Sequence, residues 1–198
     1  MHTLINRAIE GFLRDIYGED LWQAVAVSSG ADRRGFAAVG ARRANVSLAM
    51  VDHACRCLDK PRDELLQDLG AWIAGRESIR RLLRFSGDSY GSFLDSLHEL
   101  PGRAHLVVPD LGMPRLVVSD EADGWRRVRL QDAAIEWCPV MAGLMRAMAD
   151  DYGALSLIET EGDVIRVHVS DGAFAQGRAF DLAGPPPGAG GPAQRALP

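Results

Sequence analysis

The stretch that decides the fold of this chain is Phe93-Leu94-Asp95-Ser96-Leu97-His98-Glu99-Leu100-Pro101, followed by Pro109-Asp110-Leu111-Gly112-Met113-Pro114. Its large apolar residues recur at helical spacing and predict a long helix with one buried face. This helix begins after the turn signal Ser86-Gly87-Asp88. Pro101 has no backbone N–H and is expected to break it. A histidine-bearing helix and a proline-containing loop are therefore the central feature of the chain.

The residues before this stretch predict more helices. Their apolar residues return every three or four positions, and capping or first-turn residues precede the apolar runs. The expected helices cover Met1 to Gly18, a segment that starts at Glu19, Asn45 to about Leu58, and Pro61 to about Ala74. A loop rich in Gly, Arg and Ala is expected over Ser28 to Arg43.

The pattern changes after Pro109, where short alternating runs predict strands. The expected strands are Arg115 to Ser119, Trp125 to Leu130, Ala154 to Glu159 and Val164 to Ser170. A strongly apolar helix, roughly Trp137 to Tyr152, separates the two pairs. The chain is therefore expected to be α+β, with a helical N-terminal half and a smaller antiparallel sheet that packs on one long helix.

The length and composition set the organisation. The 198 residues are 47% hydrophobic, which suffices for one domain with a real core. We expect a single domain over 1–183, with a helical part over about 1–87 and the histidine-bearing helix and α/β part over about 88–183. Residues 184–198 are rich in Gly, Pro and Ala without periodicity and are expected to form a disordered tail.

The charge and the cysteines exclude several classes of protein. A net charge of −5 gives no electrostatic reason to expect a nucleic-acid partner. Three cysteines, an odd number, do not form a disulfide framework and suit a reducing cytoplasm. The N-terminal helix carries charged residues and is not a signal peptide. No apolar run approaches the roughly 18 residues of a membrane span, so we expect a cytoplasmic protein that does not bind membranes.

Three blocks of sequence resemble a known family in their order and spacing. The blocks are Met1, Leu4-Ile5-Asn6, Ala8, Phe12, Tyr17-Gly18 and Trp22; the stretch quoted above; and Gly143-Leu144-Met145-Arg146-Ala147-Met148-Ala149 with Tyr152-Gly153. The resemblance is to the H-NOX (HNOB) family, the heme nitric oxide/oxygen binding domains. It implies an H-NOX-like fold and a gas sensor, in which a helix delivers one histidine to heme iron between a helical half and an α/β half.

The resemblance also implies how such a protein signals. Nitric oxide, or another diatomic gas such as oxygen, binds the heme and shifts the two halves. The implied partner is a signalling protein, in bacteria a histidine kinase or a cyclic-di-GMP enzyme, and in animals a fused guanylate cyclase. The chain is thus expected to be a regulator in signal transduction and not an enzyme. Consistent with this, it contains no Gly-rich phosphate loop and no nucleophile with an evident base.

The residues depart from the family at the two positions that hold heme. If the two prolines are aligned without a gap, the iron-ligating histidine is replaced by Pro101. Counting back from Gly153, the Tyr-x-Ser-x-Arg motif that binds the propionates falls on Leu130, Asp132 and Ala134. Arg126, Arg127 and Arg129 offer charge from the preceding strand, with a different geometry. The resemblance thus implies heme, and these substitutions weigh against it.

Two interpretations of the site therefore stay open. In the first, a displaced axial ligand binds the heme iron. This ligand is His98, after a three-residue insertion in the loop, or His105, after a shortened loop. Ile5 and Pro114 are family-like pocket positions in this interpretation. In the second, the chain is a heme-free H-NOX-fold interaction module, or binds a different ligand, and regulates a signalling partner.

Other clusters have simpler interpretations. His53 and Cys57 share a helix face, but Cys55 points elsewhere and zinc needs about four ligands, so packing is the expected role of these cysteines. Cys138 is expected to pack at a helix start, and Met141, Met145 and Met148 to form a core stripe. The adjacent carboxylates Asp150-Asp151 are expected to face solvent.

Overall fold

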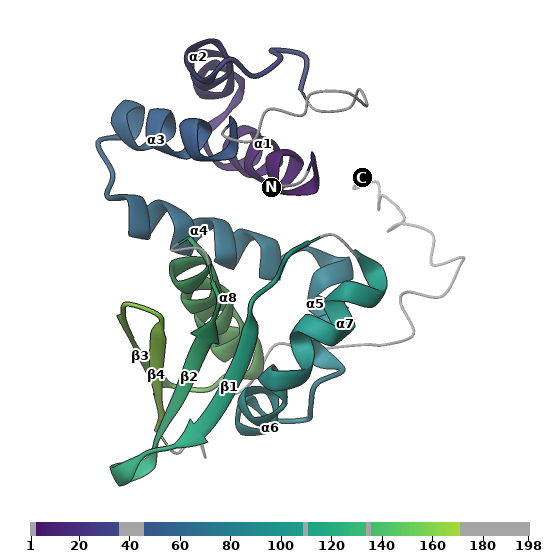
Figure 1. Ribbon diagram of the computed structural model, residues 1–198, viewed down its shortest axis with the longest axis vertical. Helices are drawn as coiled ribbons and strands as arrows, with labels where there is room; N and C mark the ends of the chain where they lie inside the picture. The colour runs from purple at the N-terminus through teal and green to yellow at the C-terminus, as the bar shows by residue number, and fades with distance from the viewer. Residues whose placement is uncertain (1–2, 36–45, 109–110, 134–135, 171–198) are drawn as a thin grey trace, which may run out of the picture.

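The computed structural model describes residues 3–35, 46–108, 111–133 and 136–170 (Figure 1). The tail predicted over 184–198, most of the predicted loop over 28–43, and the positions Asn45 and Ala134 lie outside these ranges. The helices are α1 (Thr3–Tyr17), α2 (Glu19–Ser29), α3 (Val46–Leu58), α4 (Arg62–Ala74), α5 (Glu77–Arg84), α6 (Tyr90–Asp95), η1 (Ser96–Glu99), α7 (Leu100–Val107), η2 (Ala122–Gly124) and α8 (Trp137–Tyr152). The strands are β1 (Arg115–Asp120), β2 (Trp125–Gln131), β3 (Ser156–Glu161) and β4 (Val164–Val169).

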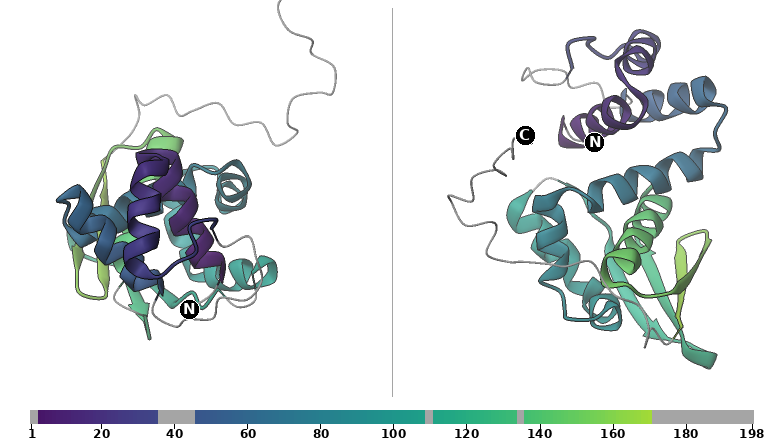
Figure 2. Two further views of the ribbon diagram at one scale, coloured as in Figure 1. Left: turned by 90° about the horizontal axis from the view of Figure 1, so that it is seen from above. Right: turned by 180° about the vertical axis from the view of Figure 1, so that it is seen from behind.

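The four strands form one antiparallel sheet in the order β1-β2-β4-β3. Successive side chains alternate between its two faces. The apolar ones face α8, which lies across one side of the sheet in Figures 1 and 2. These inward residues include Leu116, Val128, Leu130, Ile165 and Val167, each no more than 2% exposed. The predicted α+β fold, with one long helix packed on a smaller antiparallel sheet, is confirmed.

The apolar residues gather in two cores that meet on α4. The N-terminal core lies between α1, α2, α3 and one part of α4, which supplies Leu65, Leu66 and Leu69. The C-terminal core lies between α5 to α8 and the sheet, and α4 reaches it with Ala74. Figure 2 shows α1 to α3 grouped at one end of the molecule, the sheet at the other, and α4 between them.

The two cores are joined where α4 crosses α8. Gly70 on α4 and Gly143 on α8 let the two backbones approach closely, since a Cβ on Gly143 would lie 1.9 Å from the Gln67 carbonyl oxygen. A Cβ on Gly70 would lie 2.0 Å from the Val140 carbonyl oxygen. Both glycines are therefore required by contact with backbone, which cannot move aside as a flexible side chain can.

Most predicted elements are found within a few residues of their expected bounds, with three differences among the helices. α2 continues to Ser29 and ends at Gly30, whose φ of 72° supplies the left-handed C-cap. The helix α5 was not predicted. Its sequence is dominated by Arg80, Arg81 and Arg84, and Leu83 is its buried residue. Ile79 and Leu83 pack this helix on the C-terminal core, and ion pairs of Arg80 and Arg84 with Asp151 also hold it on the rest of the chain.

The predicted long helix after Asp88 is divided into α6, η1 and α7. The cause is Pro101, which has no N–H to donate to the Leu97 carbonyl four residues earlier. The turn before it tightens to 3-10 geometry, in which Leu100 N–H bonds to Leu97 O. The expected break at Pro101 is thus a local rewinding, and the helix continues to Val107 with Pro101 in its first turn.

Candidate functional site

The stretch α6-η1-α7, called the proximal segment below, presents two different faces. Leu94, Leu97 and Leu100 are buried in the C-terminal core, Ala104 is buried one turn later, and Pro101 is half-buried at the edge of this inward face. A second stripe, at the same helical spacing, is exposed throughout and consists of Asp95, His98, Gly102 and His105. Both candidate histidines therefore lie on the outer face of the segment.

His98 is directed to solvent. Its side chain is 60% exposed, and Nδ1 lies 2.8 Å from the Asp95 carbonyl oxygen. Because that oxygen accepts only, Nδ1 carries the proton and Nε2 keeps the lone pair that a metal would need. Nε2 lies 3.9 Å from the exposed Glu99 carboxylate and not against either core. The tautomer suits a ligand, but the orientation does not.

His105 lies two turns further along on the same exposed face. It is followed by Leu106 and Val107, whose residues are 83% and 66% exposed. Large apolar side chains at this level of exposure, next to a histidine, leave an apolar surface uncovered at the end of α7. Among the described residues of the proximal segment, this exposed apolar surface is the one feature that would suit an apolar ligand next to a nitrogen donor.

The two remaining predicted pocket residues belong to different parts of the molecule. Ile5 is half-buried on α1 and packs against the N-terminal core. Pro114 is buried just before β1, and its neighbour Met113 packs against the C-terminal core. α1 packs mainly on α2, α3 and α4, so the structure does not join Ile5 to the proximal segment by any substantial packing of described elements.

The positions aligned with the propionate motif provide no donors. Leu130 is 1% exposed within the C-terminal core, and Asp132 lies in a turn with a φ of 55°. Alternation along β2 sends Arg126 to the inner side, where it pairs with Asp95 at 3.0 Å, and Arg127 to the outer side, where it pairs with Glu121 at 3.3 Å. The arginines of β2 thus do not converge on one anion.

The best-defined hollows of the described residues lie elsewhere. One is a small apolar cavity of about 10 Å³ in the N-terminal core, lined by residues that include Ile9, Phe12 and Leu66. It holds one water at most by volume, and its lining offers that water no polar partner. The other is an open hollow on the sheet surface, beside Glu159, Thr160, Glu161 and Arg166. Neither hollow is lined by His98 or His105.

An ion cluster that the sequence did not reveal joins α5 to α8. Asp151 is 5% exposed, which corrects the expectation that this carboxylate faces solvent. Arg80 Nε donates to its Oδ1 at 2.6 Å, and Arg84 Nε lies 3.6 Å from Oδ2. The Arg84 guanidinium also stacks on the Tyr152 ring at 4.0 Å. The partners lie about seventy residues apart in the chain, so local spacing carried no signal of the pairing.

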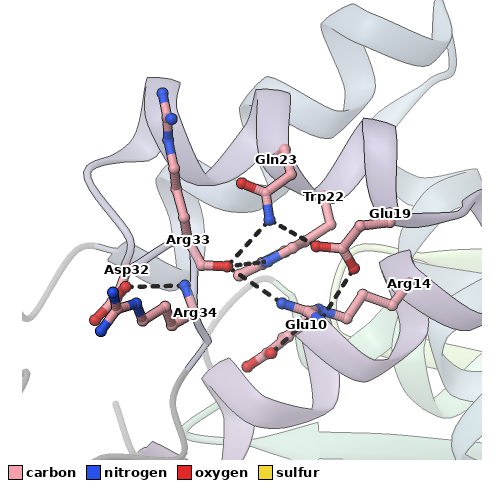
Figure 3. Close-up of polar contacts among 8 residues, drawn as sticks. All are labelled: Glu10, Arg14, Glu19, Trp22, Gln23, Asp32, Arg33 and Arg34. Atoms are coloured by element: carbon pink, nitrogen blue, oxygen red, sulfur yellow. Dashed lines mark hydrogen bonds and ion pairs between the residues drawn. The ribbon is translucent and has the colours of Figure 1, made fainter.

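A second polar network holds the start of the loop after α2. The Arg33 carbonyl oxygen accepts from Arg14 Nη2 at 3.3 Å, Trp22 Nε1 at 3.2 Å and Gln23 Nε2 at 3.2 Å (Figure 3). Figure 3 shows the Arg33 and Arg34 side chains directed away from these helices. Trp22 is fully buried, and its indole N–H needs such a partner. The network secures the loop to α1 and α2 and has no feature of a ligand site.

The cysteines and methionines behave as packing residues, with one exception. Cys138 is buried at the start of α8, and Met141, Met145 and Met148 lie in the C-terminal core, which confirms both expectations. Cys55 is half-buried, but Cys57 is exposed, so the expected packing role is wrong for Cys57, which lies on the solvent side of α3; the His53 ring contacts Arg56. No group of three or more potential ligands among His, Cys, Asp and Glu comes together within the described residues.

The thiols should differ strongly in reactivity. Burial raises the pKa of Cys138 from its ordinary value near 9 to about 11, so its thiolate fraction near pH 8 falls roughly 100-fold. A thiol-specific disulfide reagent should therefore modify Cys57 quickly and Cys138 at least about 100-fold more slowly. Cys57→Ala should remove the fast phase, and Cys138→Ala should leave it; equal rates for both thiols in the native protein would contradict the described burial.

The same shift has a consequence for stability. The folded protein binds the Cys138 thiol proton more tightly than the unfolded chain does. The resulting contribution to the free energy of unfolding is fully present below about pH 9. This contribution is lost as the pH rises from about 9 towards about 11, because only the unfolded thiol ionises there.

Among the described residues, no helix is long and apolar enough to cross a membrane. A family model for haem-NO-binding proteins matches residues 2–158. No curated protein sequence matches the chain.

Solved H-NOX structures share the fold. A mutant Cs H-NOX that carries 4-cyano-L-phenylalanine is 16% identical with a TM-score of 0.70, and the match covers 89% of this chain and 100% of that one. An S. oneidensis H-NOX in the Fe(II)NO ligation state is 14% identical with a TM-score of 0.70, with 86% and 100% covered. An oxygen-binding H-NOX domain related to soluble guanylate cyclases is 15% identical with a TM-score of 0.63, with 90% and 100% covered. At these identities the likeness shows the fold, and the family model shows the membership. Because the family model matches residues 2–158, which is most of the chain, the chain belongs to the haem-NO-binding (H-NOX) family.

Proposed function

We propose that this chain is a cytoplasmic, non-catalytic regulatory module of the H-NOX type that acts on a signalling enzyme by protein contact, without a heme held in the family's manner. H-NOX domains are sensor domains that commonly signal to partner enzymes. The partner class proposed is a histidine kinase or a cyclic-di-GMP enzyme. A net charge of −5 makes nucleic acid an unsuitable partner.

The observation that carries the proposal is the outward face of the proximal segment. A heme needs an axial lone pair directed at its iron and donors for its propionates. Here the half-buried Pro101 has no lone pair to offer, His98 is 60% exposed, and Leu130 fills the core at the first propionate position. These residues do not fit a heme held in the family's manner.

Visible absorption of the purified protein tests the heme part of the proposal. Protein from heme-replete cells is expected to show no stoichiometric Soret band, and hemin added afterwards should bind weakly and without saturation at one equivalent. His98→Ala and His105→Ala serve as matched variants, with far-UV circular dichroism as the check on folding. A stoichiometric band in the wild type would overturn the heme-free interpretation.

The regulatory part has its own readout. Where a histidine kinase or cyclic-di-GMP enzyme is encoded beside this chain, the heme-free protein should change its catalytic rate several-fold. No change in rate at saturating concentrations of the heme-free protein, together with a change on adding hemin, would overturn the proposal.

A second candidate is the function that the family implies, heme-based sensing of nitric oxide or oxygen through a displaced ligand. The observation that favours it is the apolar surface of Leu106 and Val107 next to His105. In this case the Soret band would be stoichiometric and would be lost in His105→Ala, or in His98→Ala if that residue were the ligand. The absorption experiment above therefore separates the two candidates.

A further inference from the structure

Strand β3 forms a free edge of the sheet. It stands last in the strand order β1-β2-β4-β3, and no described element other than β4 and α8 packs substantially on it. The opposite edge strand, β1, packs with η1 and α7, on the other side of the sheet in Figure 1. An uncovered edge presents backbone N–H and C=O groups with which another strand can pair.

The hydrogen bonds identify which backbone groups of β3 are free. Ser170 N–H donates to Leu155 O at 2.9 Å, so these two residues are a hydrogen-bonded pair of the β3–β4 ladder. Bonded pairs alternate along an antiparallel ladder, and the odd-numbered residues of β3 therefore bond to β4. The N–H and C=O groups of Ser156, Ile158 and Thr160 point the other way, to the free edge.

The ladder between β2 and β4 has the same phase. Leu130 N–H donates to Asp163 O at 2.8 Å, so the odd-numbered residues of β4 bond to β2 and its even-numbered residues bond to β3. The partners of those even-numbered residues are Leu157, Glu159 and Glu161. Both ladders thus leave the same backbone groups of β3 unpaired within the sheet.

The side chains of β3 give the edge an apolar end and an acidic end. Ile158 packs against the C-terminal core, so the odd-numbered residues lie on the outer face, away from α8. Leu155 is 70% and Leu157 54% exposed on that face. Glu159 has a side chain that is 50% exposed, and Glu161 is exposed. A strand added here would therefore meet two leucines and then two carboxylates.

The acidic end is also hollowed. An open hollow of about 300 Å³ lies beside Glu159, Thr160, Glu161 and Arg166. Small-molecule pockets span about 300–1,000 Å³ and are mostly apolar, so this hollow suits one long polar side chain better than a cofactor. Arg166 already pairs with Glu121 at 2.8 Å and with Glu159 at 3.3 Å. Among the described residues no lysine or arginine forms an ion pair with Glu161, which leaves that carboxylate for a cation from outside.

From this arrangement we propose that β3 is the docking edge for an extended segment of the partner enzyme, which adds antiparallel to β3 as a fifth strand. The segment has the pattern basic-x-basic-x-apolar-x-apolar. Its basic side chains lie opposite Glu161 and Glu159, and its apolar side chains lie opposite Leu157 and Leu155. That the segment belongs to a signalling enzyme rests on the proposed function, whereas the pattern rests on β3 itself.

The charges favour such a segment over a second copy of this chain. Antiparallel pairing of two β3 strands about Ile158 would place Glu159 opposite Leu157 of the other copy, and Glu161 opposite its Leu155. No carboxylate would then gain a cation. Edge charges oppose pairing with strands that do not compensate them, so the basic segment is the better match.

Hydrogen exchange followed by nuclear magnetic resonance tests the edge. The probe is a capped seven-residue peptide with lysine at its first and third positions, leucine at its fifth and seventh, and threonine between them. Bound to the full chain, it should protect the amides of Ser156, Ile158 and Thr160 and leave those already bonded to β4 unchanged. Absence of binding, or protection of β1 amides instead, would overturn the proposal. Protection of the same three amides in the protein alone, with a doubled mass in sedimentation, would make a second copy the occupant and refute the basic segment.

Two substitutions test the backbone and the charge separately. Thr160→Pro removes an outward N–H, which an edge strand tolerates, and should weaken peptide binding at least about tenfold. Thr160→Val keeps that N–H and should bind as the wild type does, with far-UV circular dichroism as the check on folding. Glu161→Lys should weaken binding of the lysine peptide about fivefold or more and favour a peptide with glutamates in place of the lysines. If the wild type and Glu161→Lys had the same preference between the two peptides, the pattern would be wrong.

The failure of this inference and that of the proposed function have different signs. Stoichiometric hemin binding by the wild type would overturn the proposed function and leave the peptide result as it is. If the heme-free protein regulates the enzyme, Thr160→Pro should abolish that regulation and Thr160→Val should preserve it. Full regulation by Thr160→Pro would exclude β3 as the docking edge and leave the proposed function intact.

Discussion

Replacing Gly143 by alanine should lower the free energy of unfolding by about 3 kcal/mol or more, a large part of the stability of a typical domain. The new Cβ would lie 1.9 Å from the Gln67 carbonyl oxygen and 2.6 Å from its carbon. Both atoms are backbone of α4, so the helices must separate. Separation would also open the close packing at Gly70, where the two backbones approach equally closely.

Urea unfolding followed by far-UV circular dichroism measures this cost. Gly102→Ala is the matched control, because Gly102 is also helical, has an exposed position, and a Cβ there would meet nothing within 4 Å. The control should be more stable than the wild type by about 0.5–1 kcal/mol, since alanine favours the helix. A Gly143→Ala protein within about 0.5 kcal/mol of the wild type would show that α4 and α8 do not cross as described.

Asp151→Asn should lower the free energy of unfolding by about 3 kcal/mol. The substitution keeps the shape of the side chain and removes the charge that two guanidinium groups share. Arg80 and Arg84 are only 19% and 15% exposed, so water cannot fully replace the carboxylate. Removal of the carboxylate weakens the compensation of two largely buried guanidinium charges, although Arg80 also lies 3.8 Å from Glu77, and this loss is the source of the cost.

Asp150→Asn is the matched control for this experiment. It removes the same charge one position earlier, from an exposed residue, and should change the stability by no more than about 0.5 kcal/mol. The difference between the two variants should persist at high salt, because buried pairs are screened much less than surface pairs. Equal effects of the two substitutions, or a difference that disappears in about 1 M salt, would place Asp151 in solvent.

The strands and α8 could be predicted because their patterns are local and strong. Alternating apolar residues in β1, β2 and β4 mark the sheet, and the run from Trp137 to Tyr152 has the length and apolar content of a buried helix. The order of these elements is also what carries the family resemblance. Hydrophobic spacing depends on residues that are close together in the sequence. It can therefore be recognised without knowing which elements pack against them.

The helix α5 and the burial of Asp151 could not be predicted because they depend on contacts between residues far apart in the sequence. The arginines of α5 form no apolar stripe, and their stabilising partner lies on α8, about seventy residues later. Asp151 follows a second aspartate at the end of a helix, where a solvent-exposed pair is the simpler interpretation. Burial of a charge depends on which counter-charge the fold brings to it, and spacing along the chain does not contain that information.

The proximal segment contains, within a few residues, both features that the sequence predicts and features that depend on tertiary contacts. By itself, the sequence determined that this stretch is helical, that Leu94 and Leu97 face a core, and that Pro101 interrupts the hydrogen-bond ladder. Only the tertiary structure decided that the helix rewinds and continues, that Arg103 donates to Ser96 O, and that His98 turns to solvent. A proline removes a backbone donor in any fold, so the sequence alone shows this effect. The direction of a histidine side chain depends on the packing around it and on which groups satisfy the neighbouring carbonyls, and only the tertiary structure decides these.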